Sequence, residues 1–172
     1  MESFWPANLI ESDRDPIPPV TFLKEQGILL SKQTKNLLVG EVRLIDPTFF
    51  NILDSEQDKN FWYQFNLYSS VINYRYDLFK ICYSVASYYP VEFVLPLALL
   101  MQVRKGLEVR EGGLKEIKFH TDKGPSIQVV SQEDLNEVLR EILNAKLTIS
   151  AVRAILEEAQ AGSSRYDMDD LT

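Results

Sequence analysis

The chain has little histidine and little cysteine: its 172 residues include only His120 and Cys82. A structural zinc site draws mainly on several Cys and His ligands, so this scarcity predicts no metal site. A Ser-His-Asp or Cys-His triad would have to use His120 as its base. A lone cysteine forms no intramolecular disulfide and therefore indicates no oxidising compartment. These shortages favour a protein without catalytic residues, metal or cofactor.

The chain also lacks a long apolar run and an excess of positive charge. Its most apolar stretch, Val91 to Val103, contains Glu92 and Pro96 and is shorter than the roughly 20 residues that cross a bilayer, so we interpret it as a buried strand and its connection. Residues 1–12 do not have the pattern of a signal peptide. The net charge of −7 opposes binding to a phosphate backbone. We therefore predict an acidic cytoplasmic protein that binds neither membranes nor nucleic acid.

The composition divides the chain into an arm, a body and a tail. Residues 1–19 are an acidic, proline-rich arm, because Pro16, Pro18 and Pro19 exclude a helix. Residues 20–162 have the length of one domain. Residues 163–172 are polar and acidic, which predicts a disordered tail.

Helical periodicity is present at both ends of the body. Val20 to Leu38 predicts a first helix, in which Gly27 marks a close packing contact. Ser131 would cap a second helix, and Thr148 or Ser150 a third that stops at Gly162. The apolar positions of the second helix follow the i, i+3, i+4, i+7, i+8 spacing: Leu135, Val138, Leu139, Ile142 and Leu143.

Alternation with a period of two occupies the region between these helices. Phe61 to Ser69 alternates strictly, and Tyr74 to Val85 alternates with a one-residue slip between Leu78 and Phe79, as a bulge produces. We predict an antiparallel hairpin from these two runs, with further short strands after it. The whole pattern predicts an α+β fold with an N-terminal helix, an antiparallel sheet of five to seven strands, and two C-terminal helices packed on one sheet face.

Three segments carry a resemblance to known sequences. They are Pro19-Val20-Thr21 with Leu23 to Gln26, then Asn73 to Tyr76 with Leu78-Phe79, and finally Tyr89-Pro90-Val91. Together with the acidic and apolar helix from Glu133 to Leu143, they resemble a family of small, uncharacterised bacterial proteins over residues 19–161. The resemblance implies a bacterial source, and it lends no activity and no catalytic residue.

The best candidate surface site is the segment from Asn73 to Asp77. In a strand, Arg75 and Asp77 share one face while Tyr74 and Tyr76 share the other. An arginine fork between aromatic neighbours can grip a carboxylate or a phosphate. The alternative interpretation is a cross-strand ion pair on an exposed face, worth less than about 1 kcal/mol.

Aromatic residues are concentrated around the predicted hairpin, with eleven between Trp62 and Phe93. A helix layer covers one face of a sheet, whereas the alternation places aromatic residues on both. The second face would be covered by the arm and the connection from Leu97 to Met101, or it would meet another molecule. Because Tyr and Trp are favoured at interfaces, we predict a non-enzymatic module that binds a protein partner or forms a homodimer. The predicted binding face comprises Trp62, Tyr68, Tyr74, Arg75, Tyr76 and Asp77.

A small-molecule binder or an unrecognised hydrolase is the alternative function. It requires a tyrosine-lined pocket in which His120, Asp122 or Arg75 converge. Asp122 could orient the imidazole of His120. Cys82 lies in a predicted strand, where a free cysteine is typically a small buried apolar residue and not a nucleophile.

Overall fold

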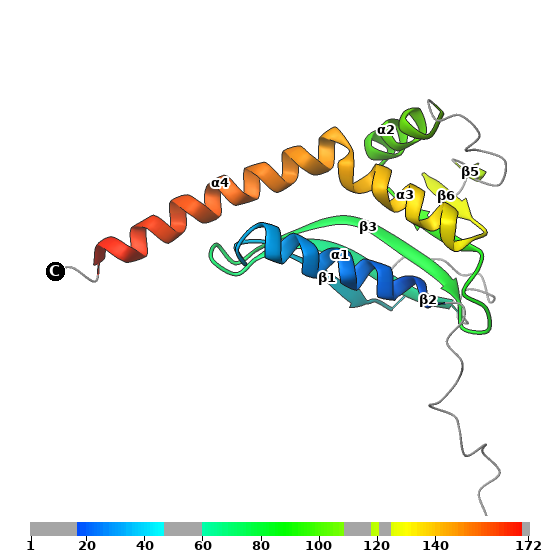
Figure 1. Cartoon of the computed structure of the whole chain (residues 1–172), viewed down its shortest axis with the longest axis horizontal. Helices are drawn as coiled ribbons and strands as arrows, with labels where there is room; N and C mark the ends of the chain where they lie inside the picture. The colour runs from blue at the N-terminus through cyan, green and yellow to red at the C-terminus, as the bar shows by residue number, and fades with distance from the viewer. Residues whose placement is uncertain (1–16, 47–59, 109–117, 121–124, 170–172) are drawn as a thin grey trace, which may run out of the picture.

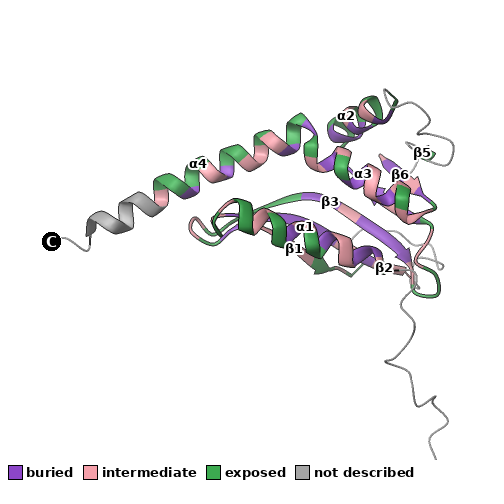
Figure 2. Ribbon diagram, viewed as in Figure 1, coloured by how far each residue is buried: buried purple, intermediate pink, exposed green. Residues whose placement is uncertain are grey.

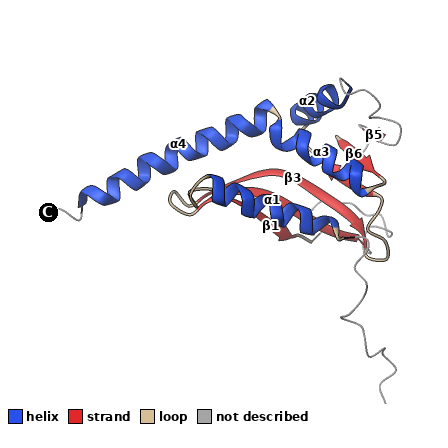
Figure 3. Cartoon of the chain, viewed as in Figure 1, coloured by secondary structure: helices blue, strands red, loops and turns tan. Residues whose placement is uncertain are grey.

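The computed structural model describes residues 17–46, 60–108, 118–120 and 125–169, which form one layer of helices on one sheet (Figure 1). Figure 3 separates the helices from the strands beneath them. In chain order the elements are α1 (Pro19–Gln33), β1 (Val39–Leu44), β2 (Asn60–Ser69), β3 (Tyr74–Ser84), β4 (Val91–Val94), α2 (Leu97–Glu108), β5 (Lys118–His120), β6 (Ser126–Val129), α3 (Gln132–Asn144) and α4 (Lys146–Asp169).

The six described strands form one sheet in the order β1-β2-β3-β4-β6-β5, and every neighbouring pair is antiparallel. The α+β fold class, the N-terminal helix, the antiparallel sheet and the two C-terminal helices are therefore confirmed. Residues 1–16 of the predicted arm and residues 170–172 of the predicted tail lie outside the described residues, and the division into an arm (1–19), a body (20–162) and a tail (163–172) stays a prediction.

The β2–β3 hairpin contains the bulge that the sequence predicts. Phe65 pairs with Phe79 and Asn66 with Asp77, which leaves Leu78 as the extra residue of β3. A one-residue slip exchanges the two faces of a strand. Phe79 and the residues alternating after it therefore face the helices, and so do the even-numbered Tyr74 and Tyr76 before the bulge.

Helix α1 begins at Pro19, one residue before the predicted start at Val20, so Pro19 belongs to the helix and does not exclude it; the helix also ends earlier than predicted. Pro19 occupies the first turn, where a missing N–H costs nothing. The helix ends at Gln33 and not at Leu38, because the Thr34 hydroxyl donates to the carbonyl of Leu30 and accepts from the N–H of Leu38. The close packing contact at Gly27 is confirmed, since a Cβ there would collide with the carbonyl oxygen of Gly40 in β1. Two glycines thus let α1 lie directly on β1.

Helix α2 corrects the prediction for the most apolar stretch. Residues from Leu97 onward form a helix and not a connection between strands. Leu99, Val103 and Leu107 recur at helical spacing and are buried against the other helices and the sheet. Because α2 belongs to the helix layer, the segment from Leu97 to Met101 does not cover the second face of the sheet.

Helices α3 and α4 follow one another with one residue between them. The Ser131 hydroxyl accepts from the N–H of Asp134 at 3.1 Å, which confirms the predicted cap of α3. Helix α4 continues through Gly162 to Asp169, so the predicted stop at Gly162 is wrong. A Cβ on Gly162 would lie 3.3 Å from a methyl carbon of Ile72, so the glycine lets α4 approach the tip of the hairpin.

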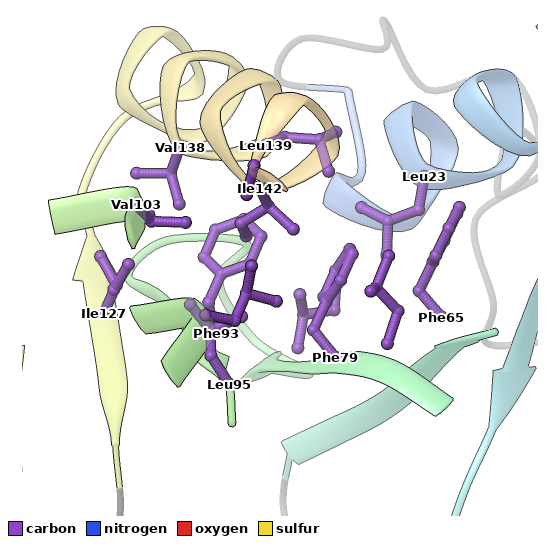
Figure 4. Packing of buried hydrophobic residues seen from close by; sticks show 14 of the residues in the cluster. Leu23, Phe65, Phe79, Phe93, Leu95, Val103, Ile127, Val138, Leu139 and Ile142 are labelled. Carbon is purple, nitrogen blue, oxygen red and sulfur yellow. The ribbon is translucent and has the colours of Figure 1, made fainter. Parts of the chain in front are cut away.

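The core lies between the helix layer and the sheet (Figure 4). Phe79 is at its centre, stacked on Phe65 at 5.2 Å between ring centroids and tilted against Phe93 at 5.9 Å. Leu23 of α1 and Ile142 of α3 cover these rings from above. In Figure 2 the buried residues are concentrated in the sheet strands and recur along the helices that cover them.

Candidate functional site

The structure divides the six predicted binding residues between the two faces of the sheet. Tyr74 and Tyr76 face the helix layer beside α4. The other four lie on the outer face, which points away from the four described helices: Trp62, Tyr68, Arg75 and Asp77. The predicted residues therefore do not form one continuous surface.

Trp62 does not contribute an exposed ring to the outer face. It is 5 % exposed and pairs across the hairpin with Cys82, which is also buried. Tyr68, beside Arg75, lies six residues farther along β2, a separation of about 20 Å at strand spacing. Trp62 and Arg75, two members of the predicted binding face, are therefore not close neighbours on the outer face.

Arg75 already has its partners. Its Nε donates to Glu41 Oε2 at 2.7 Å and its second nitrogen to Oε1 at 3.4 Å, while its guanidinium lies 4.8 Å from the centre of the Tyr68 ring. The hydrogen bond to Glu41 raises the pKa of Arg75 above its usual value. Because the fork is engaged within the chain, the arrangement is that of the cross-strand ion pair, the alternative that the sequence left open.

Two of the residues proposed for an enzyme, His120 and Arg75, come from separate parts of the sheet. The backbone of His120 lies in β5, which β6 and β4 separate from the β3 strand of Arg75. Asp122 lies outside the described residues. Burial raises the pKa of the Cys82 thiol to about 12, so the thiol stays protonated and unreactive near neutral pH. Within the described ranges, no group of three or more His, Cys, Asp or Glu residues is placed to hold a metal ion.

Tyr74 and Tyr76 line a small hollow between the hairpin and α4. Its volume is about 290 Å³, and its other walls include Ile72, Ala154 and Ile155. The two rings are 47 % and 37 % exposed. The lining of the hollow is apolar apart from the tyrosine hydroxyls and one glutamate. It therefore offers apolar contact area and few hydrogen-bonding or charged groups.

A larger groove, which the sequence did not reveal, lies nearer the start of α4. It has a volume of about 690 Å³ and separates α1 from the α3–α4 pair, all on the same face of the sheet. Its walls are the α1 segment 26–34, the α3 segment 136–144 and the start of α4, and Phe65 and Leu67 form its floor. The volume is within the range of about 300–1,000 Å³ that ligand sites occupy.

The accessible apolar surface of this groove belongs to its walls. Phe65 and Leu67 are buried beneath them. Leu29 is 46 % exposed, and four further apolar wall residues are half-buried: Leu30, Leu143, Ile149 and Val152. Packing α1 on the sheet does not require an exposed leucine. Leu29 makes the apolar stripe of α1 wider than this packing needs, and that extra width was the sequence signal for a groove.

The rim of the groove is polar and carries one positive charge. Gln26 and Gln33 of α1 lie opposite Asn136 and Asn144 of α3, and Arg140 is the only charged residue among the described residues that line the groove. Arg140 is exposed and forms no ion pair with any residue in the described part of the chain. In a chain of net charge −7, the described residues that line the groove thus include no carboxylate.

Searches of protein families, curated proteins and solved structures gave no match to this chain. No helix in the described ranges has the length and apolar character to span a bilayer. The functional assignment therefore depends on the geometry of the groove and the hollow.

Proposed function

We propose that the protein is a non-enzymatic interaction module that holds a helical segment of a protein partner in the groove between α1 and α3–α4. The observation that carries the proposal is the open groove itself, with Leu29 exposed at its edge and Leu143, Ile149 and Val152 half-buried along it. Apolar grooves between helices receive amphipathic helices through apolar residues at i, i+3, i+4 and i+7.

The geometry of the layer supports a helix as the occupant. The two walls are helices over a shared sheet, and each contributes about two turns of side chains to the groove. A third helix laid between them would extend the existing helix layer and would pack against Leu29 and Leu30 on one side. Its apolar residues would contact Ile149 and Val152 on the other side.

The composition of the walls favours a protein segment over a lipid chain. About half of the residues that line the groove are polar, including Gln26, Gln33 and Asn136. A lipid chain would remove their amides from water without offering hydrogen bonds, which is costly. A peptide offers both apolar side chains and polar groups, so it satisfies both parts of the wall.

Site-specific photo-crosslinking in the source cells tests the proposal. A photoreactive amino acid is placed at Leu29, on the groove, or at Ile28, the matched control on the same helix, which is 55 % exposed and does not line the groove. We expect a discrete protein adduct at position 29 and none at position 28. Mass spectrometry of the adduct distinguishes another protein from a second copy of the chain, which would support self-association.

A third position tests the second candidate function, in which the tyrosine hollow binds a small apolar ligand or a partner. The hollow supports this candidate because Tyr74 and Tyr76 expose ring surface beside Ala154. An adduct formed only from position 154 would move the interaction to the hollow. Adducts from none of the three positions, or equal adducts at 28 and 29, would contradict the groove proposal.

A further inference from the structure

We propose that the helix received by the groove is acidic, with a carboxylate that pairs with Arg140. This inference rests on the proposed function and adds the chemical class of the partner. The starting observation is the charge of the lining: one arginine, no lysine and no carboxylate among the described lining residues. Such a site complements a negatively charged ligand and repels no carboxylate at short range.

Arg140 is well placed for this role. It lies on α3 with Asn136 one turn before it and Asn144 one turn after it, and all three line the groove. Asn144 donates to the backbone carbonyl of Arg140 at 2.8 Å, which leaves the guanidinium of Arg140 uninvolved in that bond. In contrast to Arg75, which Glu41 holds, Arg140 has no carboxylate partner among the described residues.

The neighbouring amides extend the same preference. Asparagine and glutamine side chains each present an NH₂ group that donates to a carboxylate oxygen. Asn136, Gln26 and Gln33 stand around the apolar walls together with Arg140. A partner helix could place an apolar stripe against the apolar walls. Asp or Glu residues beside that stripe would then pair with Arg140 and the amides. A basic helix would meet the guanidinium without compensation.

A selection from a displayed library of helix-forming peptides on the full-length chain tests this inference. We expect the enriched peptides to carry apolar residues at i, i+3, i+4 and i+7 and an excess of Asp and Glu over the unselected library. The affinity of an enriched synthetic peptide, measured by fluorescence anisotropy, should fall about tenfold or more with Arg140→Glu. A selection on the Arg140→Glu variant should enrich basic peptides instead.

Matched variants separate this inference from the proposed function. Arg153→Glu makes the same charge change at an exposed position of α4 that does not line the groove, and it should change the affinity less than about twofold. Leu29→Lys should abolish binding, and Ile28→Lys should not. Binding that needs Leu29 but shows no acidic preference and tolerates Arg140→Glu would overturn this inference alone. No enrichment, or equal loss with both leucine and isoleucine variants, would overturn the groove as a binding site.

Discussion

The two faces of the sheet use their residues in opposite ways. The helix-facing side holds the packed rings of Phe65, Phe79 and Phe93 in the core. The outer face holds hydrogen-bonded polar groups, including the Arg75–Glu41 pair and the 2.7 Å bond from Ser126 to Glu92. Most aromatic rings of the hairpin therefore lie on the helix-facing side. Among the described rings of β2 and β3, only those of Trp62 and Tyr68 point outward.

Burial is a poor guide to which face a residue occupies. Trp62, Gln64, Asn66 and Cys82 belong to the outer face and are nevertheless buried. The amide of Gln64 donates to the carbonyl of Phe79 at 3.3 Å, so part of this burial is compensated. The outer face is therefore buried around Trp62, Gln64, Asn66 and Cys82, and it is more exposed near Arg75. The open groove, by contrast, lies on the helix-facing side of the sheet.

The largest expected effect comes from removing a ring on the helix-facing side. Phe79→Ala should lower the free energy of unfolding by about 3–5 kcal/mol, because it leaves a cavity between Phe65 and Phe93. Tyr68→Ala, on the outer face, should cost about 1 kcal/mol or less, as a half-buried ring beside an exposed ion pair. Urea unfolding of both variants measures the comparison. Equal losses would show that the two faces contribute alike.

An intermediate effect should come from Cys82, which is on the outer face and yet buried. Its folded-state pKa of about 12 lies above the value of 9.0 for a free thiol, so the folded state keeps the proton longer. The stabilisation is therefore complete below pH 9 and is lost as the pH rises from 9 toward 12, by about 1.4 kcal/mol per pH unit at most.

The free energy of unfolding of the wild-type chain and of Cys82→Ser, measured at pH 8 and pH 10, isolates the contribution of the thiol, because serine does not titrate. The wild-type chain should lose more stability than the variant between the two values. The native thiol should also react with an aromatic disulfide reagent about a thousandfold more slowly than the urea-unfolded chain, in proportion to its thiolate fraction. A native thiol that reacts as fast as the unfolded one would contradict the burial of Cys82.

The smallest effect should come from the ion pair on the more exposed part of the outer face. In a double-mutant cycle with Arg75→Ala and Glu41→Ala, the coupling energy should be less than about 1 kcal/mol, since both side chains are partly exposed to water. Raising the salt concentration should reduce it further. A coupling of several kcal/mol would mean that the outer face near Arg75 is as buried as the region around Trp62.

The sequence predicted the elements whose periodicity is long and regular. Phe61 to Ser69, the slip at Leu78 and the α3 stripe were read correctly because each depends on local spacing. Helix α2 was missed because Pro96 and the short length of the apolar run favoured a connection. The stop at Gly162 was wrong because a packing contact with Ile72 can require glycine as strongly as a helix end does.

The candidate site was harder to predict, because it depends on contacts distant in sequence. The groove brings Leu29, Phe65, Arg140 and Val152 together, and no local spacing connects these positions. The ion pair between Arg75 and Glu41 could not be predicted from the sequence either, because Glu41 lies two strands away in the sheet. The one local signal was the apolar residue Leu29, whose exposure only the structure shows.

The glycine contacts at the two edges of the helix layer have a consequence for recognition. Gly27 seats the α1 wall of the groove on β1, and Gly162 lets α4, farther along than its groove-lining residues, approach the hairpin tip. The Thr148 hydroxyl also donates to the carbonyl of Ile142 at 2.6 Å, which fixes the angle between α3 and α4. The width of the opening is therefore set before anything enters it. Under the proposed function, the incoming segment would lose conformational freedom on binding, while the helices that form the groove would lose little.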